Sequence, residues 1–157
     1  MWGFCFARKG NRMMSMKVAN KKIVLDYLKR NKLMTLSTVS GNRPWSATVF
    51  FAYDEKGQIF FYSRPNTKHC RHILKNPYVS VVVNHDHGTP GHVKGMQITG
   101  RAKRVPEKDI KKDYAVYRKR FPWADEFSDH NLYVVVPAEI HYIDHKRFGH
   151  FFRVKMN

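Results

Sequence analysis

Apolar positions recur at steps of three and four near the start of the chain, and this period predicts a helix over residues 17–31. Further along, runs rich in β-branched and aromatic residues are separated by turn-forming residues, a pattern typical of strands. These strands are predicted at residues 33–39, 45–53, 59–62, 78–83, 93–105, 132–136 with a continuation at 140–143, and 148–154. Two more helices are predicted, at residues 67–74 and 106–120.

Turn residues indicate how these elements connect. Gly57 can adopt a positive φ and closes a predicted hairpin, while Asn66 is expected to cap the second helix. Gly95 and Gly100 fall inside a predicted strand, where glycine marks a bulge or the close approach of another backbone or a ligand. Short connections between consecutive strands favour an antiparallel arrangement over a doubly wound sheet. The sequence therefore predicts a mainly β protein, with six or seven antiparallel strands closed into a barrel and peripheral helices packed around it.

Length and composition fit one domain with an ordinary core. The chain has 157 residues, of which 43% are hydrophobic, and we expect a single domain over residues 16–157. Met13, Met14 and Met16 are alternative starts, so residues 1–15 are expected to be a disordered leader or a start-site artefact. Two cysteines fit a reducing, cytoplasmic compartment. No apolar run approaches the ~20 residues that a bilayer span requires, so no membrane partner is expected.

The charge balance points to an anionic partner. Lysine and arginine total 29 against 12 acidic residues, which gives a formal net charge of +17. One alternative is therefore a basic nucleic-acid-binding β-barrel protein without enzymatic activity, because the helix predicted at residues 106–120 combines basic with aromatic residues. The residues concerned are Lys108, Lys111, Lys112, Arg118, Lys119 and Arg120, with Tyr114, Tyr117 and Phe121. The simpler interpretation packs the aromatic residues on the barrel and leaves the lysines in solvent, so nucleic-acid binding ranks second.

The stretch most informative about chemistry joins the strand predicted at residues 59–62 to the next helix. Ser63 and Thr67 can donate hydroxyl hydrogen bonds, and Lys68 adds a positive charge beside the free amides of the first helical turn. Such a turn suits a phosphate dianion, and the aromatic end of the preceding strand suits a flat ring. The alternative is a capped helix whose basic face is only solvated.

Histidine and cysteine suggest two further kinds of site. His85, His87 and His92 have a spacing that metal ligands can use, but the glycines and proline around them favour a plain polar turn. We therefore predict no metal site. Cys70 is expected to fill the core rather than act as a nucleophile, and the sequence identifies no catalytic residue.

Several short motifs follow one another in a set order between residues 33 and 105. They are Gly41-Asn42-Arg43-Pro44-Trp45-Ser46-Ala47-Thr48-Val49-Phe50-Phe51, Asp54-Glu55-Lys56-Gly57, Phe60-Phe61-Tyr62-Ser63, Thr67-Lys68, Asn76-Pro77-Tyr78-Val79-Ser80-Val81 and Gly95-Met96-Gln97-Ile98-Thr99-Gly100-Arg101-Ala102. Together they resemble the FMN-binding split-barrel superfamily typified by pyridoxamine 5′-phosphate oxidase. The resemblance implies a split β-barrel homodimer that holds FMN at its interface, two per dimer, with deazaflavin or haem as alternative cofactors.

The same resemblance implies which residues hold the cofactor. Those expected along the ring and ribityl chain are Ser46, Val49, Phe50 and Phe51, with Phe61 and Tyr62 nearby. Those expected at the phosphate are Thr67 and Lys68, and Ser63 is added because its hydroxyl can donate a hydrogen bond there. Gln97 of the other subunit is expected to reach the ring.

Departures from the oxidase pattern limit what the resemblance implies. The oxidase has arginine where this chain has Ser46 and Thr67, so Arg64 or Arg71 is expected to compensate. The oxidase's C-terminal substrate-binding segment is not recognisable in residues 117–157, so vitamin B6 oxidation is not implied. We expect a flavin-dependent oxidoreductase with an unidentified small-molecule substrate or reductant. Residues expected to line its pocket are Tyr62, His150 and Trp123, although core packing or a surface role is the simpler reading of each.

Overall fold

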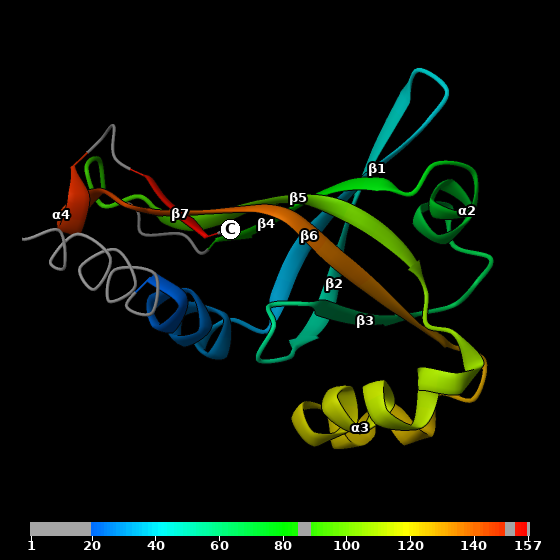
Figure 1. Cartoon of the computed structure of the whole chain (residues 1–157). Coiled ribbons are helices and arrows are strands. Elements are labelled where there is room, and N and C mark those ends of the chain that lie inside the picture. The colour runs from blue at the N-terminus through cyan, green and yellow to red at the C-terminus, as the bar shows by residue number, and fades with distance from the viewer. Residues whose placement is uncertain (1–19, 85–88, 150–152, 157) are drawn as a thin grey trace, which may run out of the picture.

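The computed structural model describes residues 20–84, 89–149 and 153–156. A helix at residues 20–30 comes first, and seven strands follow with short helices between them (Figure 1). The strands are β1 (Leu33–Ser40), β2 (Arg43–Tyr53), β3 (Ile59–Ser63), β4 (Tyr78–Asn84), β5 (Lys94–Arg104), β6 (Asn131–Asp144) and β7 (Arg153–Met156). The later helices are α2 (Lys68–Lys75), α3 (Ile110–Arg120) and α4 (His145–Phe148), with 3-10 helices η1 (Glu107–Asp109) and η2 (Pro122–Glu126).

The strands form one antiparallel sheet in the order β3-β2-β1-β4-β5-β6-β7, and an additional pairing between β3 and β6 closes six of them into a barrel. Strand β6 allows this closure because it is long. Its first part pairs with β3 over residues 131–135, and its later part carries β7 over residues 140–143. Along most of its length it also lies against β5. The predicted mainly β split barrel with peripheral helices is confirmed.

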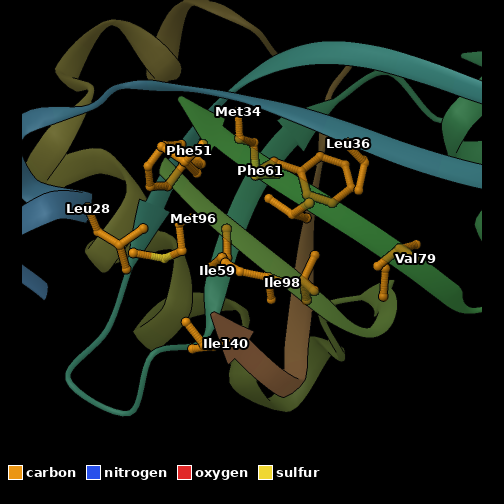
Figure 2. Close-up of a cluster of buried hydrophobic side chains, with 14 of the residues drawn as sticks. Leu28, Met34, Leu36, Phe51, Ile59, Phe61, Val79, Met96, Ile98 and Ile140 are labelled. Carbon is orange, nitrogen blue, oxygen red and sulfur yellow. The ribbon is translucent and has the colours of Figure 1, made fainter. Parts of the chain in front are cut away.

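Inward-facing side chains fill the barrel. Met34 and Leu36 alternate with outward residues along β1, and Phe51, Phe61 and Ile98 meet them from other strands (Figure 2). Each of these five is at most 1% exposed. Burial of this apolar area is the main source of the barrel's stability.

A second apolar cluster lies outside the barrel, between the strands and α3. Ala52, Phe60 and Leu132 contribute from the strands, while Tyr117 and Phe121 contribute from α3 and its end. Strands β2 and β3 are therefore packed on both faces where they approach α3. This packing positions β2 and β3 next to the residues of the predicted site.

Two local predictions are wrong. The N-cap position of α2 is Thr67 rather than Asn66, and the Thr67 side chain makes no capping hydrogen bond. Phe148 lies in α4 and not in the last strand, which is described at Arg153–Met156. Helix α4 forms because Asp144 caps it, accepting a hydrogen bond from the Arg147 amide at 3.1 Å.

The predictions for Gly57 and Gly100 are confirmed. Gly57 has a φ of 80° in the hairpin between β2 and β3. Gly100 lies at a register shift between β5 and β6, where a Cβ would collide with the carbonyl of Val136. None of the described helices is both long and apolar enough to span a membrane. The prediction for residues 1–15 lies outside the described residues.

Candidate functional site

The turn between β3 and α2 is held by its own hydrogen bonds. The Thr67 hydroxyl donates to the Arg64 carbonyl oxygen at 2.9 Å, and the Thr67 amide donates to the same oxygen at 3.2 Å. Arg64, Pro65 and Asn66 remain exposed. The local sequence therefore folds into a compact turn that presents the N-terminus of α2 to one side.

His69, one residue into α2, lies beneath this turn. Its Nε2 is 3.0 Å from Ser63 Oγ and 3.2 Å from Thr67 Oγ1. Burial, reinforced by the neighbouring His72, lowers the pKa of His69. The imidazole is therefore neutral near pH 7 and acts as a hydrogen-bonding group. Sequence reasoning gave His69 no role.

A pocket of about 450 Å³ opens beside the turn. It is lined by Thr48, Val49 and Phe50 of β2, Tyr62 and Ser63 of β3, Arg64, Thr67 and His69 around the turn, Tyr117 of α3, and Trp123, Phe127 and His130 from the segment after α3. Its volume lies in the range usual for small-molecule sites.

One wall of the pocket is a row of aromatic rings. Phe50 meets Trp123 at 5.2 Å between ring centroids, and Trp123 meets Phe127 at 5.8 Å. His130 continues the row, 5.1 Å from Phe127 and 5.2 Å from Tyr62. Phe50, Trp123 and Phe127 stay 43%, 37% and 37% exposed, a large apolar area to leave in water. Such a wall can stack against a flat ring.

Asp129 links two residues of the pocket lining, Arg64 and His130. Arg64 Nε lies 2.7 Å from Asp129 Oδ2, and Asp129 Oδ1 accepts a hydrogen bond from His130 Nδ1 at 2.7 Å. The bond from His130, supported by the charge of Arg64, lowers the pKa of Asp129. No hydrogen bond from His130 Nε2 is observed within the described part of the chain, and His130 lines the pocket.

Five of the ten residues expected at the cofactor come together in this pocket. They are Val49, Phe50, Tyr62, Ser63 and Thr67. Trp123 and Tyr62 line it as expected, whereas His150 lies outside the described residues. Of the two arginines expected to compensate, Arg64 lines the pocket and Arg71 does not.

The other five expected residues lie elsewhere. Phe51 and Phe61 are fully buried in the barrel, and the Phe61 ring stacks on Tyr133 at 5.1 Å. The Lys68 ammonium lies 4.2 Å from the centroid of the Trp45 ring, outside the pocket lining. Ser46 hydrogen-bonds Ser37 at 2.9 Å on the outer face of the sheet. Gln97 is exposed on the outer face of β5.

Three of the earlier alternatives can be placed on the structure. Tyr117 and Phe121 are only 1% and 2% exposed, so α3 turns these aromatic residues to the barrel and not to a polynucleotide. No cluster of metal-ligating side chains occurs among the described residues, and His85 and His87 are outside them. Cys70 is fully buried, in agreement with a packing role, and burial raises the pKa of its thiol.

Sequence reasoning missed part of the pocket. Thr48, His69 and Tyr117 lie within predicted elements, but Phe127 and His130 come from a segment with no predicted structure. The density of aromatic residues between 114 and 133 was the available signal, because a soluble chain leaves few such residues without a partner.

Comparisons with known proteins agree on the architecture. The family model described as pyridoxamine 5′-phosphate oxidase matches residues 21–144. The UPF0306 protein of Photorhabdus laumondii is 28% identical over 104 residues, which cover 66% of this chain and 73% of that protein.

Two solved structures share the fold at low identity. A heme-binding protein from Mycobacterium smegmatis superposes with a TM-score of 0.70 and 15% identity, covering 90% of this chain and 57% of that one. An FAD-binding protein from Mesorhizobium loti superposes with a TM-score of 0.62 and 18% identity, covering 74% of this chain and 88% of that one.

Proposed function

Because this chain belongs to the pyridoxamine 5′-phosphate oxidase family, we propose that it binds FMN and acts as a flavin-dependent oxidoreductase on a small molecule. The proposal rests on the observation that the two ends of one pocket differ in chemistry. Aromatic rings form one end, and a hydroxyl-rich turn at a helix N-terminus forms the other. A flavin nucleotide is itself a flat ring joined to a phosphate, so its two ends match.

The residues present fit such a ligand. Phe50, Trp123 and Phe127 would shield the ring from water, while Ser63 and Thr67 lie where a phosphate would approach the free amides of α2. Arg64 supplies a guanidinium on the same side, although Asp129 shares it. When bound, the flavin would supply hydride or electron transfer, and the protein would orient the substrate and exclude solvent.

We also propose that His130 can accept a proton from a substrate bound in this pocket. His130 is held by Asp129 and packed between Tyr62 and Phe127, so its free nitrogen has a fixed direction. This group can accept a proton from a substrate O–H or N–H, and Arg64 helps to hold the carboxylate that orients it.

We further propose that the cofactor is bound by a homodimer. Gln97 stands opposite Val82, Val82 opposite Thr35, and Thr35 opposite Thr48, which lines the pocket. Three strand spacings of ~4.8 Å place Gln97 about 14 Å from Thr48 in one protomer, too far for its side chain to reach. A second copy packed on this face is the arrangement by which Gln97 would contribute to the ring.

Haem is a second candidate cofactor. The observation in its favour is the Asp129–His130 hydrogen bond, because a histidine that ligates a metal usually donates its other ring N–H to a carboxylate. Support also comes from the shared fold with a heme-binding protein.

Absorption spectra of the purified protein after incubation with FMN or with haemin test these proposals. We expect a yellow protein with quenched flavin fluorescence, because the aromatic wall would stack on the ring. Trp123→Ala should weaken FMN about five- to tenfold, since one aromatic stack is worth roughly 1 kcal/mol. Leu74→Ala truncates a side chain that is 74% exposed on α2 and serves as the control.

The outcomes separate the candidates. A protein that stays colourless with FMN contradicts the flavin proposal. If haemin binds instead, and His130→Ala abolishes the characteristic haem spectrum, the second candidate replaces the first.

A further inference from the structure

Ser63, Thr67 and His69 meet at the end of the pocket where the phosphate is proposed to bind. Together these side chains have fewer polar hydrogens than the hydrogen bonds that they could make. His69 Nε2 lies between Ser63 Oγ at 3.0 Å and Thr67 Oγ1 at 3.2 Å. Ser63 is 6% exposed and His69 is 8% exposed, so water has little access to either group. Their mutual hydrogen bonds therefore decide which hydrogens remain available to a ligand.

The hydrogen inventory fixes the direction of these bonds. Thr67 has a single hydroxyl hydrogen, and it is donated to the Arg64 carbonyl oxygen at 2.9 Å. Toward His69, Thr67 can then act only as an acceptor, so the 3.2 Å contact is a hydrogen bond when His69 Nε2 carries the hydrogen. A neutral imidazole with Nε2–H donates to both oxygens that lie near it. Ser63 becomes an acceptor as well, and its own hydroxyl hydrogen is left free.

We propose that His69 is a positioning residue that makes Ser63 a hydrogen-bond donor to a phosphate monoester in this pocket. The inference rests on the proposed function, because it assigns the phosphate of that ligand to this end. An imidazole with its hydrogen on Nδ1 would have the opposite effect. Its unprotonated Nε2 would accept the hydroxyl hydrogen of Ser63, which would then not be available to a ligand in the pocket. The tautomer of one buried histidine therefore controls whether Ser63 binds an anion.

The surroundings of His69 are compatible with this role. The neighbouring His72 is engaged through Nδ1 with Thr38 Oγ1 of β1 at 3.2 Å. Arg64, whose carbonyl anchors Thr67, has its guanidinium on Asp129. The Phe61 ring packs edge-on against His69 at 6.0 Å and restricts its rotation. The imidazole is thus fixed in place by groups that do not compete for Nε2.

Variants at position 69 separate positioning from packing. His69→Gln keeps an N–H donor near the place of Nε2, whereas His69→Leu fills the space without one. We expect His69→Leu to weaken FMN about tenfold and to leave riboflavin, which lacks the phosphate, unchanged. His69→Gln should retain FMN affinity within about threefold. His72→Gln is the matched control, because it alters the other buried histidine of α2 without touching the pocket.

A double-mutant cycle tests whether His69 acts through Ser63. Ser63→Ala should itself weaken FMN about tenfold, and adding His69→Leu should then cost nothing more. Additive losses, or an equal loss of FMN and riboflavin in His69→Leu, would overturn the inference.

Nitrogen NMR of the ligand-free protein reads the tautomer directly. We expect Nε2–H, and Nδ1–H at position 69 would overturn the inference without any flavin. If the protein binds no FMN, the proposed function fails, but titration with inorganic phosphate still decides the inference. A shift of the His69 ring signals on adding phosphate would support it, and unmoved signals would reject it.

Discussion

Arg64 and Lys68 flank the same turn but lie in different environments. Arg64 lines the pocket and pairs with Asp129, whereas the Lys68 ammonium lies over the Trp45 ring. We expect Arg64→Ala to weaken FMN about ten- to a hundredfold, as the loss of a charge-assisted bond to phosphate implies. Lys68→Ala should weaken it less. Fluorescence titration with FMN measures both, and a larger loss in Lys68→Ala would mean that the lysine leaves Trp45 when the phosphate arrives.

Asp144 is a second residue whose environment has a measurable consequence, the dependence of stability on pH. Burial raises its pKa, but three donors outweigh that effect and the net pKa is lowered. They are Lys94 Nζ at 3.0 Å, the Tyr142 hydroxyl at 3.1 Å and the Arg147 amide at 3.1 Å. Because the folded pKa lies below the unfolded one, the carboxylate stabilises the fold above about pH 4 and loses this effect as the pH falls through the folded pKa.

Asp144→Asn should therefore lower the free energy of unfolding by about 2 kcal/mol at pH 7. The difference from the parent protein should shrink steadily below pH 4. Urea unfolding at several pH values measures this, and Asp125→Asn, at an exposed carboxylate, is the control with little effect at either pH. A penalty that is the same at pH 7 and pH 3 would contradict the role given to the Asp144 charge.

How far the site could be predicted differs from residue to residue. Ser63 and Thr67 were found because strand, hydroxyl residues and helix start are adjacent in the sequence. Phe127 and His130 were not, because their place depends on how the segment after α3 folds back onto β2 and β3. Phe61 was expected near the ring on the strength of a motif, but alternation along β3 turns it into the barrel.

At the level of elements, Arg120 joins two helices that are far apart in the sequence. Its Nη2 donates to the carbonyl oxygens of Leu28, Lys29 and Asn31 at the end of the helix at residues 20–30. Its guanidinium also lies 4.9 Å from the Phe51 ring centroid. A cation at a helix C-terminus is favourable because it meets unpaired carbonyls and the negative end of the dipole.

Arg120→Ala should lower the free energy of unfolding by about 2–3 kcal/mol, as several hydrogen bonds from a charged group are lost. The neighbouring Arg118→Ala should change it by less than about 1 kcal/mol, since that arginine pairs with Asp125 at the surface. Urea unfolding of both variants is the measurement. Equal effects would show that the first helix is held by its apolar face alone.

Most elements were predictable, and the exceptions have local causes. Periodicity gave the barrel strands and the first three helices, since each has a long or well-bounded pattern. Helix α4 has four residues, too few to show a period, so its aromatic Phe148 was assigned to the following strand. The bonds made by Arg120 span about ninety residues, and no local pattern indicates contacts of that range.

At the level of the whole molecule, one face of the barrel remains open. Ser46, Ser37, Ser80 and Thr99 stand opposite one another on neighbouring strands, and Ser46, Ser80 and Thr99 are exposed. A groove of about 650 Å³ lies on this face, and Arg101 forms part of its edge. Because the side chains on this face are short, a second copy could approach the sheet closely. An isologous contact would place the same patch, including Gln97, on both subunits.

Ser80→Arg tests this assembly at the centre of the open face. Its cross-strand neighbours, Ser37 and Thr99, are short, so one protomer should accept the larger side chain, whereas two facing copies would bring like charges together. We expect a folded monomer by sedimentation velocity and weaker FMN binding, because Gln97 of the partner subunit would no longer reach the ring. Glu55→Arg adds an arginine in the exposed hairpin turn and should leave the dimer intact. A Ser80→Arg protein that remains dimeric would place the interface elsewhere, and a wild-type monomer that binds FMN fully would contradict the dimer proposal.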